Sequence, residues 1–204
     1  MATGAQGREP FEAVVLAAGS GVRFGGGKLL ASYAGGLVLE GALRAAFAAP
    51  VRGVTLVIGA DAPRVAAAAR GWAQAAGEIQ RLRIVHAANH EDGMGASLSA
   101  GVAALPPGAA GVFVFLGDMP RVPEGVLDAL AVAARGAPAA APVFDGRRGH
   151  PVVIGRSLFP QVLALSGDQG ARAVLQPLGE RLALVPAPDD GVLFDVDERK
   201  DLLR

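Results

Sequence analysis

Apolar and polar residues follow two alternating patterns along the chain. Short and nearly continuous apolar runs are typical of strands that are buried on both faces of a sheet. These runs predict strands at residues 13–17, 54–58, 82–86, 112–116, 139–143, 151–154, 182–185 and 192–194.

Between these runs, apolar residues recur at the spacing of a helix. We expect a helix to end at Pro50, and another to begin after Asp61 with Pro63 in its first turn, where proline has no N–H to lose. The pattern predicts helices at 37–49, 63–76, 94–105 and 123–134, two pieces within 158–175 broken at Gly167, and a terminal helix at 198–203.

Strands that alternate with helices favour a mostly parallel sheet covered on both faces, a three-layer α/β/α arrangement. Ligands of such sheets bind at the carboxyl ends of the strands. The loop after residue 17 and the residues after 116 both stand at such ends. We therefore look for a site there.

The first predicted strand leads into a glycine-rich loop. Residues 13–28 read AVVLAAGSGVRFGGGK, and five of the ten residues that follow the strand are Gly. Glycine lets a ligand approach the backbone closely, and Arg23 and Lys28 add two cations. Exposed N–H groups together with two cations suit a polyphosphate.

Two better-known phosphate loops do not fit this stretch. A dinucleotide-binding G-x-G-x-x-G motif would need Gly where Phe24 stands. A P-loop needs Gly five residues before the Gly27-Lys28 pair, and Ser or Thr after it, but the chain has Val22 and Leu29. A third kind of nucleotide loop is therefore indicated.

Composition narrows the function classes. The chain has 204 residues, 19 basic and 19 acidic side chains and no cysteine. We expect one domain, residues 1–204, with a flexible tail at residues 1–10. Balanced charge predicts neither a nucleic acid nor a membrane partner, and the lack of cysteine leaves oxygen or His as metal ligands. Without a signal-like or membrane-spanning run, we expect a cytoplasmic protein.

Two acidic clusters are candidate metal ligands. Residues 117–120 read GDMP and place Asp118 directly after a buried strand, where a carboxylate could bind Mg²⁺, although a turn residue would look the same. Residues Asp195 and Asp197 could share one face of an extended segment, with Asp201 behind them. An acidic helix N-terminus explains this second cluster nearly as well.

Three further motifs follow in order. Asn89 precedes GMGASL at 93–98, RGHPV stands at 148–152, and GDQGAR stands at 167–172. Taken one at a time, the three motifs are explained equally well by local structure: the first as the start of a helix, the second as a hairpin turn and the third as a break in a helix.

Together with L-A-A-G-x-G-x-R-x-G-x-x-K at 16–28 and G-D-x-P at 117–120, the chain resembles the MobA-like nucleotidyltransferases over residues 16–202. Ala18 and Ser97 resemble the molybdenum cofactor cytidylyltransferase branch, whereas the GTP-using branch typically has L-A-G-G and G-P-L-A-G. Gly21 replaces the usual Ser and Phe24 the usual Met. The tail DVDERKDL departs from the typical D-I-D-T-P-E-D-L.

The resemblance implies a Rossmann-like, GT-A-like fold and transfer of CMP from CTP to the terminal phosphate of molybdopterin, with release of pyrophosphate. Asp118 and Asp197 would hold Mg²⁺, with Asp195 open as the alternative second ligand. Catalytic roles fall on Arg23, Lys28 and Asp118. The nucleotide-binding set is Leu16, Ala17, Ala18, Gly19, Arg23, Lys28, Asn89 and Ser97.

The acceptor side would be formed by His150, Asp168 and Arg172, and a transient contact with a molybdoenzyme chaperone fits the same resemblance. Four other functions compete with this assignment. They are a guanylyltransferase, a sugar-phosphate nucleotidyltransferase, an inactive nucleotide-binding accessory protein, and a hydrolase that uses Ser20, Asp118 and His150.

Overall fold

The computed structural model describes residues 11–204, so the tail expected at residues 1–10 lies outside the described residues. One eight-stranded sheet forms the centre, with seven strands in the order β10-β7-β9-β6-β1-β4-β5 and β8 paired to β7. The strands are β1 (Phe11–Ala17), β4 (Val54–Ile58), β5 (Leu82–His86), β6 (Gly111–Leu116), β7 (Ala139–Phe144), β8 (Arg147–Arg148), β9 (Val152–Gly155) and β10 (Leu182–Pro186).

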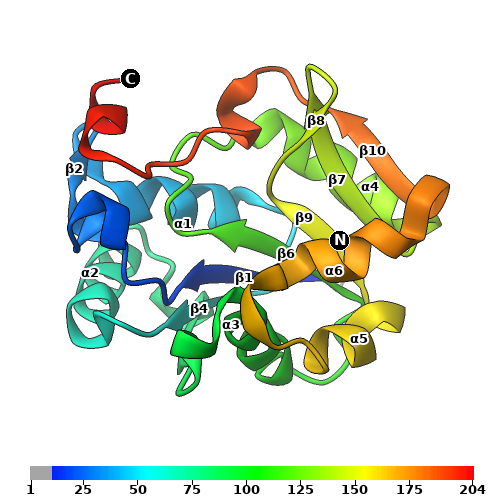
Figure 1. The fold of residues 1–204 in the computed structure, drawn as a ribbon, viewed down its shortest axis with the longest axis horizontal. Coiled ribbons are helices and arrows are strands. Elements are labelled where there is room, and N and C mark those ends of the chain that lie inside the picture. The colour runs from blue at the N-terminus through cyan, green and yellow to red at the C-terminus, as the bar shows by residue number, and fades with distance from the viewer. Residues whose placement is uncertain (1–10) are drawn as a thin grey trace, which may run out of the picture.

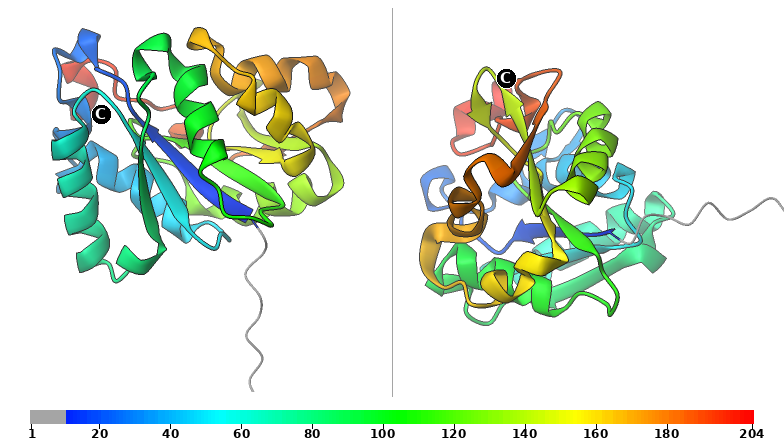
Figure 2. Two further views of the ribbon diagram at one scale, coloured as in Figure 1. Left: turned by 90° about the horizontal axis from the view of Figure 1, so that it is seen from below. Right: turned by 90° about the vertical axis from the view of Figure 1, so that its right-hand side faces the viewer.

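Helices cover both faces of this sheet, as the alternating pattern predicted. One apolar cluster joins the sheet to α1 (Val38–Ala48), α2 (Ala62–Ala75) and α4 (Leu127–Gly136). A second cluster on the other face contains α3 (Met94–Ala103), α5 (Phe159–Leu163) and α6 (Gly170–Leu175). Figures 1 and 2 show the sheet between these two layers, and the three-layer α/β/α fold is confirmed.

The central strand shows why apolar runs appear here. Along β1, Ala13, Val15 and Ala17 belong to the first cluster, whereas Val14 belongs to the second. Successive side chains of a strand point to opposite faces, so a strand covered on both faces needs apolar residues at every position.

The order of the strands creates a crevice beside β1. The chain runs from β1 to its neighbour β4 and on to β5, and then crosses to β6 on the other side of β1. Both neighbours are parallel to β1, and Leu16 near its end is in register with Leu116 of β6. Such a change of direction separates the connecting segments at the carboxyl edge and leaves room for a ligand.

The predicted strand at 192–194 is wrong. Asp189 accepts a hydrogen bond from the N–H of Gly191 at 2.8 Å, and a 3-10 turn follows at Asp190–Val192. Val192 is buried in the cluster that joins the sheet to α1, α2 and α4, and Phe194 in a smaller cluster, but neither belongs to a strand of the sheet. The alternating apolar residues at 192–194 thus correctly predicted that the side chains are buried, but wrongly predicted that the backbone pairs with the sheet.

Other differences are smaller. β9 runs antiparallel to both β6 and β7, so the sheet is mixed. The expected terminal helix is a 3-10 helix at Arg199–Leu203, and a short hairpin of β2 (Ser32–Tyr33) and β3 (Gly36–Leu37) follows the glycine-rich loop. Among residues 11–204, every helix is too short or too polar to span a bilayer.

The C-terminal segment returns to the first loop. Phe24, Val38, Phe194 and Val196 form a small buried cluster, and the rings of Tyr33 and Phe194 stack with centroids 6.1 Å apart. Figure 1 shows this last segment beside the β2 hairpin. The cluster brings two chain regions about 170 residues apart to one side of the crevice.

Candidate active site

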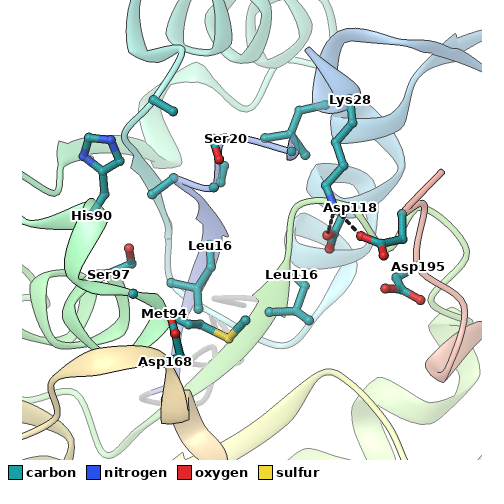
Figure 3. A pocket seen from close by; sticks show the side chains of 18 of the residues that line it. Leu16, Ser20, Lys28, His90, Met94, Ser97, Leu116, Asp118, Asp168 and Asp195 are labelled. Atoms are coloured by element: carbon teal, nitrogen blue, oxygen red, sulfur yellow. Dashed lines mark hydrogen bonds and ion pairs between the residues drawn. The ribbon is translucent and has the colours of Figure 1, made fainter. Parts of the chain in front are cut away.

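A cavity of about 680 Å³ opens at the carboxyl ends of β1 and β6. This volume falls within the range that small-molecule sites usually have. Lys28, Asp118 and Asp195 lie together on one side of it, as Figure 3 shows. The lining residues are Leu16, Ala17, Ala18, Gly19, Ser20, Gly21, Lys28, Leu29, Ala60, His90, Glu91, Gly93, Met94, Ser97, Leu116, Asp118, Asp168, Asp195 and Asp197.

Backbone hydrogen bonds position Asp118 at the cavity. The N–H of Gly117 donates to the carbonyl of Leu16 at 2.8 Å, and a Cβ on Gly117 would lie 3.0 Å from that oxygen. The N–H of Val196 in turn donates to the carbonyl of Asp118 at 2.9 Å. The ends of β1 and β6 and the C-terminal segment are therefore joined at the residue that bears the carboxylate.

Two cations and two carboxylates alternate in a chain of ion pairs. Lys28 Nζ lies 2.6 Å from Asp118 Oδ2 and 3.7 Å from Asp197 Oδ1. Arg23 Nη1 lies 2.8 Å from Asp197 Oδ2. The Lys28 side chain is only 13% exposed, whereas that of Arg23 is 79% exposed. Lys28 is thus the inner cation, and Arg23 stands at the rim.

These neighbours shift the protonation of the acidic tail in opposite directions. The hydrogen bond from Arg23, with the charge of Lys28, lowers the pKa of Asp197 below its usual value. Burial, followed by repulsion from Asp118, raises the pKa of Asp195. The two acids of the tail therefore differ in environment: Asp197 is stabilised as an anion by its cationic neighbours, whereas burial disfavours the charge on Asp195.

The arrangement fits a divalent cation that takes few protein ligands. Asp118 and Asp197 both lie within ion-pair distance of the same ammonium group, so their carboxylates converge on one place. Among the described residues, no group of three or more acidic or His side chains is arranged to hold a metal. Magnesium commonly uses one or two carboxylates and completes its shell with water and phosphate oxygens.

The glycine-rich loop folds back so that Lys28 enters the cavity. Gly21 has φ +62° and begins a 3-10 turn at Val22–Phe24, and Gly27 has φ +66° just before Lys28. A Cβ on Gly21 would lie 3.3 Å from Lys28 Cγ, which is tighter than ordinary contact. Glycine at position 21 therefore both forms the turn and leaves room for the lysine stem.

A second loop covers the start of α3. Gly93 has φ +111°, and a Cβ there would clash with the Asp168 carboxylate and the backbone of Gly167. A Cβ on Gly95 would lie 2.8 Å from the carbonyl oxygen of Gly167. These glycines let the segment that bears Asp168 approach α3 and bring its carboxylate to the cavity.

The structure gathers most of the predicted site residues. Those lining the cavity are Leu16, Ala17, Ala18, Gly19, Lys28, Ser97, Asp118, Asp168 and Asp197. Arg23 joins them through its ion pair with Asp197. The cavity thus unites the predicted nucleotide and metal residues, and Asp168 lies with them rather than with the other two predicted acceptor residues.

Three predicted residues lie apart from the cavity lining. Asn89 and Arg172 are exposed. The ring of His150 lies beneath the sheet edge, where its Nδ1 is 3.4 Å from the carbonyl of Val114, and burial lowers its pKa. The roles of these three stay predictions.

Sequence reasoning missed His90, Glu91 and Met94. All three line the cavity, and His90 is the immediate neighbour of the predicted Asn89. His90 belongs to none of the motifs that the sequence contains, so the motifs did not indicate it. A search for titratable residues close to the G-M-x-x-S-L motif would have found it.

Comparisons with known proteins bear on this site. The model of the family described as "MobA-like NTP transferase domain" matches residues 13–183. Nicotine blue oxidoreductase from Paenarthrobacter nicotinovorans is 32% identical and the purine catabolism protein PucB from Bacillus subtilis 33% identical, each over 94% of both chains. These names differ from each other, so the relatives do not by themselves identify a substrate.

A solved structure of Rv0371c from Mycobacterium tuberculosis H37Rv is also similar. It has a TM-score of 0.81 at 26% identity and covers 97% of this chain and 98% of its own. Another structure of that protein, described as a complex with manganese, has a TM-score of 0.69 at 25% identity and covers 87% of this chain and 88% of its own.

Proposed function

The chain belongs to the MobA-like NTP transferase family, and from that premise we propose that it transfers CMP from CTP to the terminal phosphate of a molybdopterin-type acceptor. An oxygen of the acceptor phosphate attacks the α-phosphorus, the bond between the α- and β-phosphates breaks, and pyrophosphate leaves with the electron pair. The product is molybdopterin cytosine dinucleotide.

The observation that carries the proposal is the position of Lys28 between Asp118 and Asp197. Phosphoryl transfer requires mainly positioning and charge neutralisation, and no covalent nucleophile from the protein. In this account Lys28 and Arg23 exchange their carboxylate partners for the β- and γ-phosphates and hold the leaving pyrophosphate. Released from these ion pairs, Asp118 and Asp197 become available as ligands.

Asp118 and Asp197 would hold Mg²⁺, with Asp195 as the alternative second ligand. Bound there, the ion supplies neutralisation of the charge on the α-phosphate. Convergence of the two carboxylates on one ammonium supports this assignment, and so does the manganese complex of Rv0371c.

Two residues support a cytidine nucleotide. The backbone from Leu16 to Gly19 would read the base edge, and Ala18, where the guanylyl branch has Gly, would add a largely buried methyl group at the wall of the cavity. A methyl-sized difference in a pocket typically gives discrimination of about 1–3 kcal/mol. The other residue that supports a cytidine nucleotide is Ser97, which is buried in the first turn of α3 and is a candidate contact for the base or ribose.

The hydrolase alternative receives no support from the contacts. Asp118 is bonded to Lys28, and the His150 ring faces the carbonyl of Val114. Among residues 11–204, Ser20, Asp118 and His150 make no hydrogen bond with one another, as the bonds of a catalytic triad would require.

The experiment is a pyrophosphate-release assay with CTP or GTP, Mg²⁺ and either molybdopterin or a sugar phosphate. We expect release that requires molybdopterin and is faster with CTP. Faster turnover with GTP would assign the chain to the guanylyl branch, and turnover only with the sugar phosphate would replace the acceptor. No release with any pair would favour an accessory role.

A further inference from the structure

His90 occupies a side of the cavity that the family motifs do not describe. It follows β5 in a short 3-10 turn, His90–Asp92, and its ring packs against the end of β4. A Cβ on Gly59 would lie 2.6 Å from both His90 Cγ and the carbonyl oxygen of Ala18. Only glycine at position 59 allows the imidazole to lie beside the backbone that precedes the phosphate loop.

The hydrogen bonding of this ring defines what it offers to a ligand. His90 Nδ1 lies 3.1 Å from the carbonyl oxygen of Ala87. A carbonyl can only accept a hydrogen bond, so the contact requires the proton on Nδ1, and a neutral ring then bears a lone pair on Nε2. Among residues 11–204, no hydrogen bond or ion pair engages Nε2.

The cavity also presents two carboxylates, which accept hydrogen bonds when ionised. Glu91 and Asp168 line the cavity, and neither carboxylate makes a hydrogen bond or ion pair within the described chain. Figure 3 shows His90 and Asp168 on the side away from Lys28 and Asp118. Of the described lining residues, Lys28 alone is a lysine or arginine, and it belongs to the opposite side.

A nucleotide can complement both sides of this cavity, because it has anionic phosphates at one end and a base with hydrogen-bond donors at the other. With its phosphates at Lys28, a nucleotide that extends across the cavity would bring its base toward the side that bears His90. Cytosine carries an N–H donor at its 4-position, whereas uracil carries a carbonyl oxygen there. The lone pair on Nε2 would accept from the first and repel the second.

We propose that His90 is a base-reading residue that selects cytosine over uracil through Nε2. This inference rests on the proposed function, because it assumes that the cavity binds a nucleotide. It adds a side chain whose polarity, rather than size, distinguishes the two pyrimidines. Ala18 separates purines from pyrimidines by volume, so the two residues act on different competitors.

The test is isothermal titration of CTP and UTP with Mg²⁺ at about pH 8, where free imidazole is neutral. Two variants separate the two ring nitrogens. His90→Asn can still donate to the Ala87 carbonyl but has no group at the Nε2 position. His90→Gln places there an amide that can either donate or accept. The control is Gln74→Asn, which changes an exposed side chain of α2 outside the cavity lining.

We expect the parent and Gln74→Asn to bind CTP about tenfold more tightly than UTP, as one well-placed polar contact can produce. Both His90 variants should bring the two dissociation constants to within about threefold of each other. If the His90 variants leave the ratio of the CTP and UTP dissociation constants unchanged, even while both nucleotides bind more weakly, the role of His90 is overturned and the proposed function stays intact. Failure of the parent to bind either nucleotide would overturn both.

Discussion

At the scale of single residues, Lys28 is the group on which the account depends most. It contacts Asp118 and Asp197 and is mostly buried, so no other cation can easily take its place. The chain has one further lysine, Lys200, which is exposed and paired with Glu198 at 2.8 Å. The two lysines provide a matched pair for mutation.

We predict that Lys28→Ala lowers kcat/KM at least about a hundredfold, because the leaving pyrophosphate loses its inner cation. Lys200→Ala should retain the parent activity within about twofold, since exposed ion pairs contribute little. Steady-state pyrophosphate release measures both. A folded Lys28→Ala enzyme with parental kcat/KM would show that the loop does not hold the phosphates.

Asp118→Asn is the corresponding change on the acidic side. The amide preserves the shape of the side chain and removes the charge that would bind Mg²⁺, so we expect kcat to fall about a hundredfold or more with little loss of stability. A Mg²⁺ titration of activity and a thermal melt separate these effects. Activity within a few-fold of the parent would contradict the metal role of Asp118.

How far the sequence predicted these residues depends on the kind of signal. Lys28 and Asp118 could be found because each follows a buried strand within a spaced motif. The contact of Lys28 with Asp197 could not, because it depends on the C-terminal segment, which the hydrogen bond from Val196 to the carbonyl of Asp118 holds beside the site. His90 could have been found by its closeness to the G-M-x-x-S-L motif, but its contact with Gly59, 31 positions earlier, could not, because only the fold brings the two together.

At the scale of elements, the C-terminal segment positions Asp197 although it belongs to no regular helix or strand. The buried carboxylate of Asp201 accepts hydrogen bonds from the N–H groups of Glu198 and Asp197, at 2.8 and 3.0 Å. These bonds lower the pKa of Asp201 below its usual value. The segment is therefore held by an ionised side chain.

Asp201→Ala should accordingly lower the melting temperature at pH 7. Because the folded state depresses the pKa of Asp201, the stabilisation is present above the unfolded pKa, about 4, and is lost as pH falls through the lower folded value. The difference between parent and variant should thus shrink in melts at pH 3. A difference that is equal at pH 7 and pH 3 would contradict the charged cap.

The entrance to α3 is the second element with a strict requirement. Gly93 has φ +111° and ψ −175°, a region almost confined to glycine, and a Cβ would also clash with Asp168. We predict that Gly93→Ala destabilises the fold by about 1–3 kcal/mol, a loss of roughly 2–10 °C in Tm.

The control for this prediction is Gly71→Ala in α2. Gly71 is exposed, has no neighbour within 4 Å of a new Cβ, and stands inside a helix. Alanine there should stabilise the protein by about 0.5–1 kcal/mol. Gly93→Ala melting at or above the parent temperature would show that the α3 entrance tolerates a side chain.

Elements were predicted well where burial and hydrogen bonding coincide. All the strands of the sheet that carry long apolar runs were found, because a run covered on both faces has few other solutions. The strand at 192–194 failed because Val192 and Phe194 are buried by side-chain packing, while the backbone there forms a 3-10 turn rather than a strand of the sheet. The β2 hairpin, two residues a strand, is too short to leave a pattern.

At the scale of the whole molecule, the order of the strands accounts for the place of the site. The sheet changes direction beside β1, and every charged group of the cavity comes from a loop at that edge or from the returning C-terminal segment. The same framework occurs in relatives whose names differ widely. The shared framework therefore does not by itself fix a substrate, and we expect substrate choice to depend on the loops at this edge.

The most direct test of the central claim is a thermal-melting panel with CTP, GTP, UTP, ATP and NAD, each with Mg²⁺ and with EDTA. A ligand that binds only the folded state stabilises it by about 2.7 kcal/mol at a hundred times its Kd, or roughly 5–10 °C for a domain of this size. We predict the largest shift for CTP with Mg²⁺ and a smaller one with EDTA. The largest shift with GTP or NAD would contradict the cytidylyl assignment, and no shift with any nucleotide would contradict the nucleotide site itself.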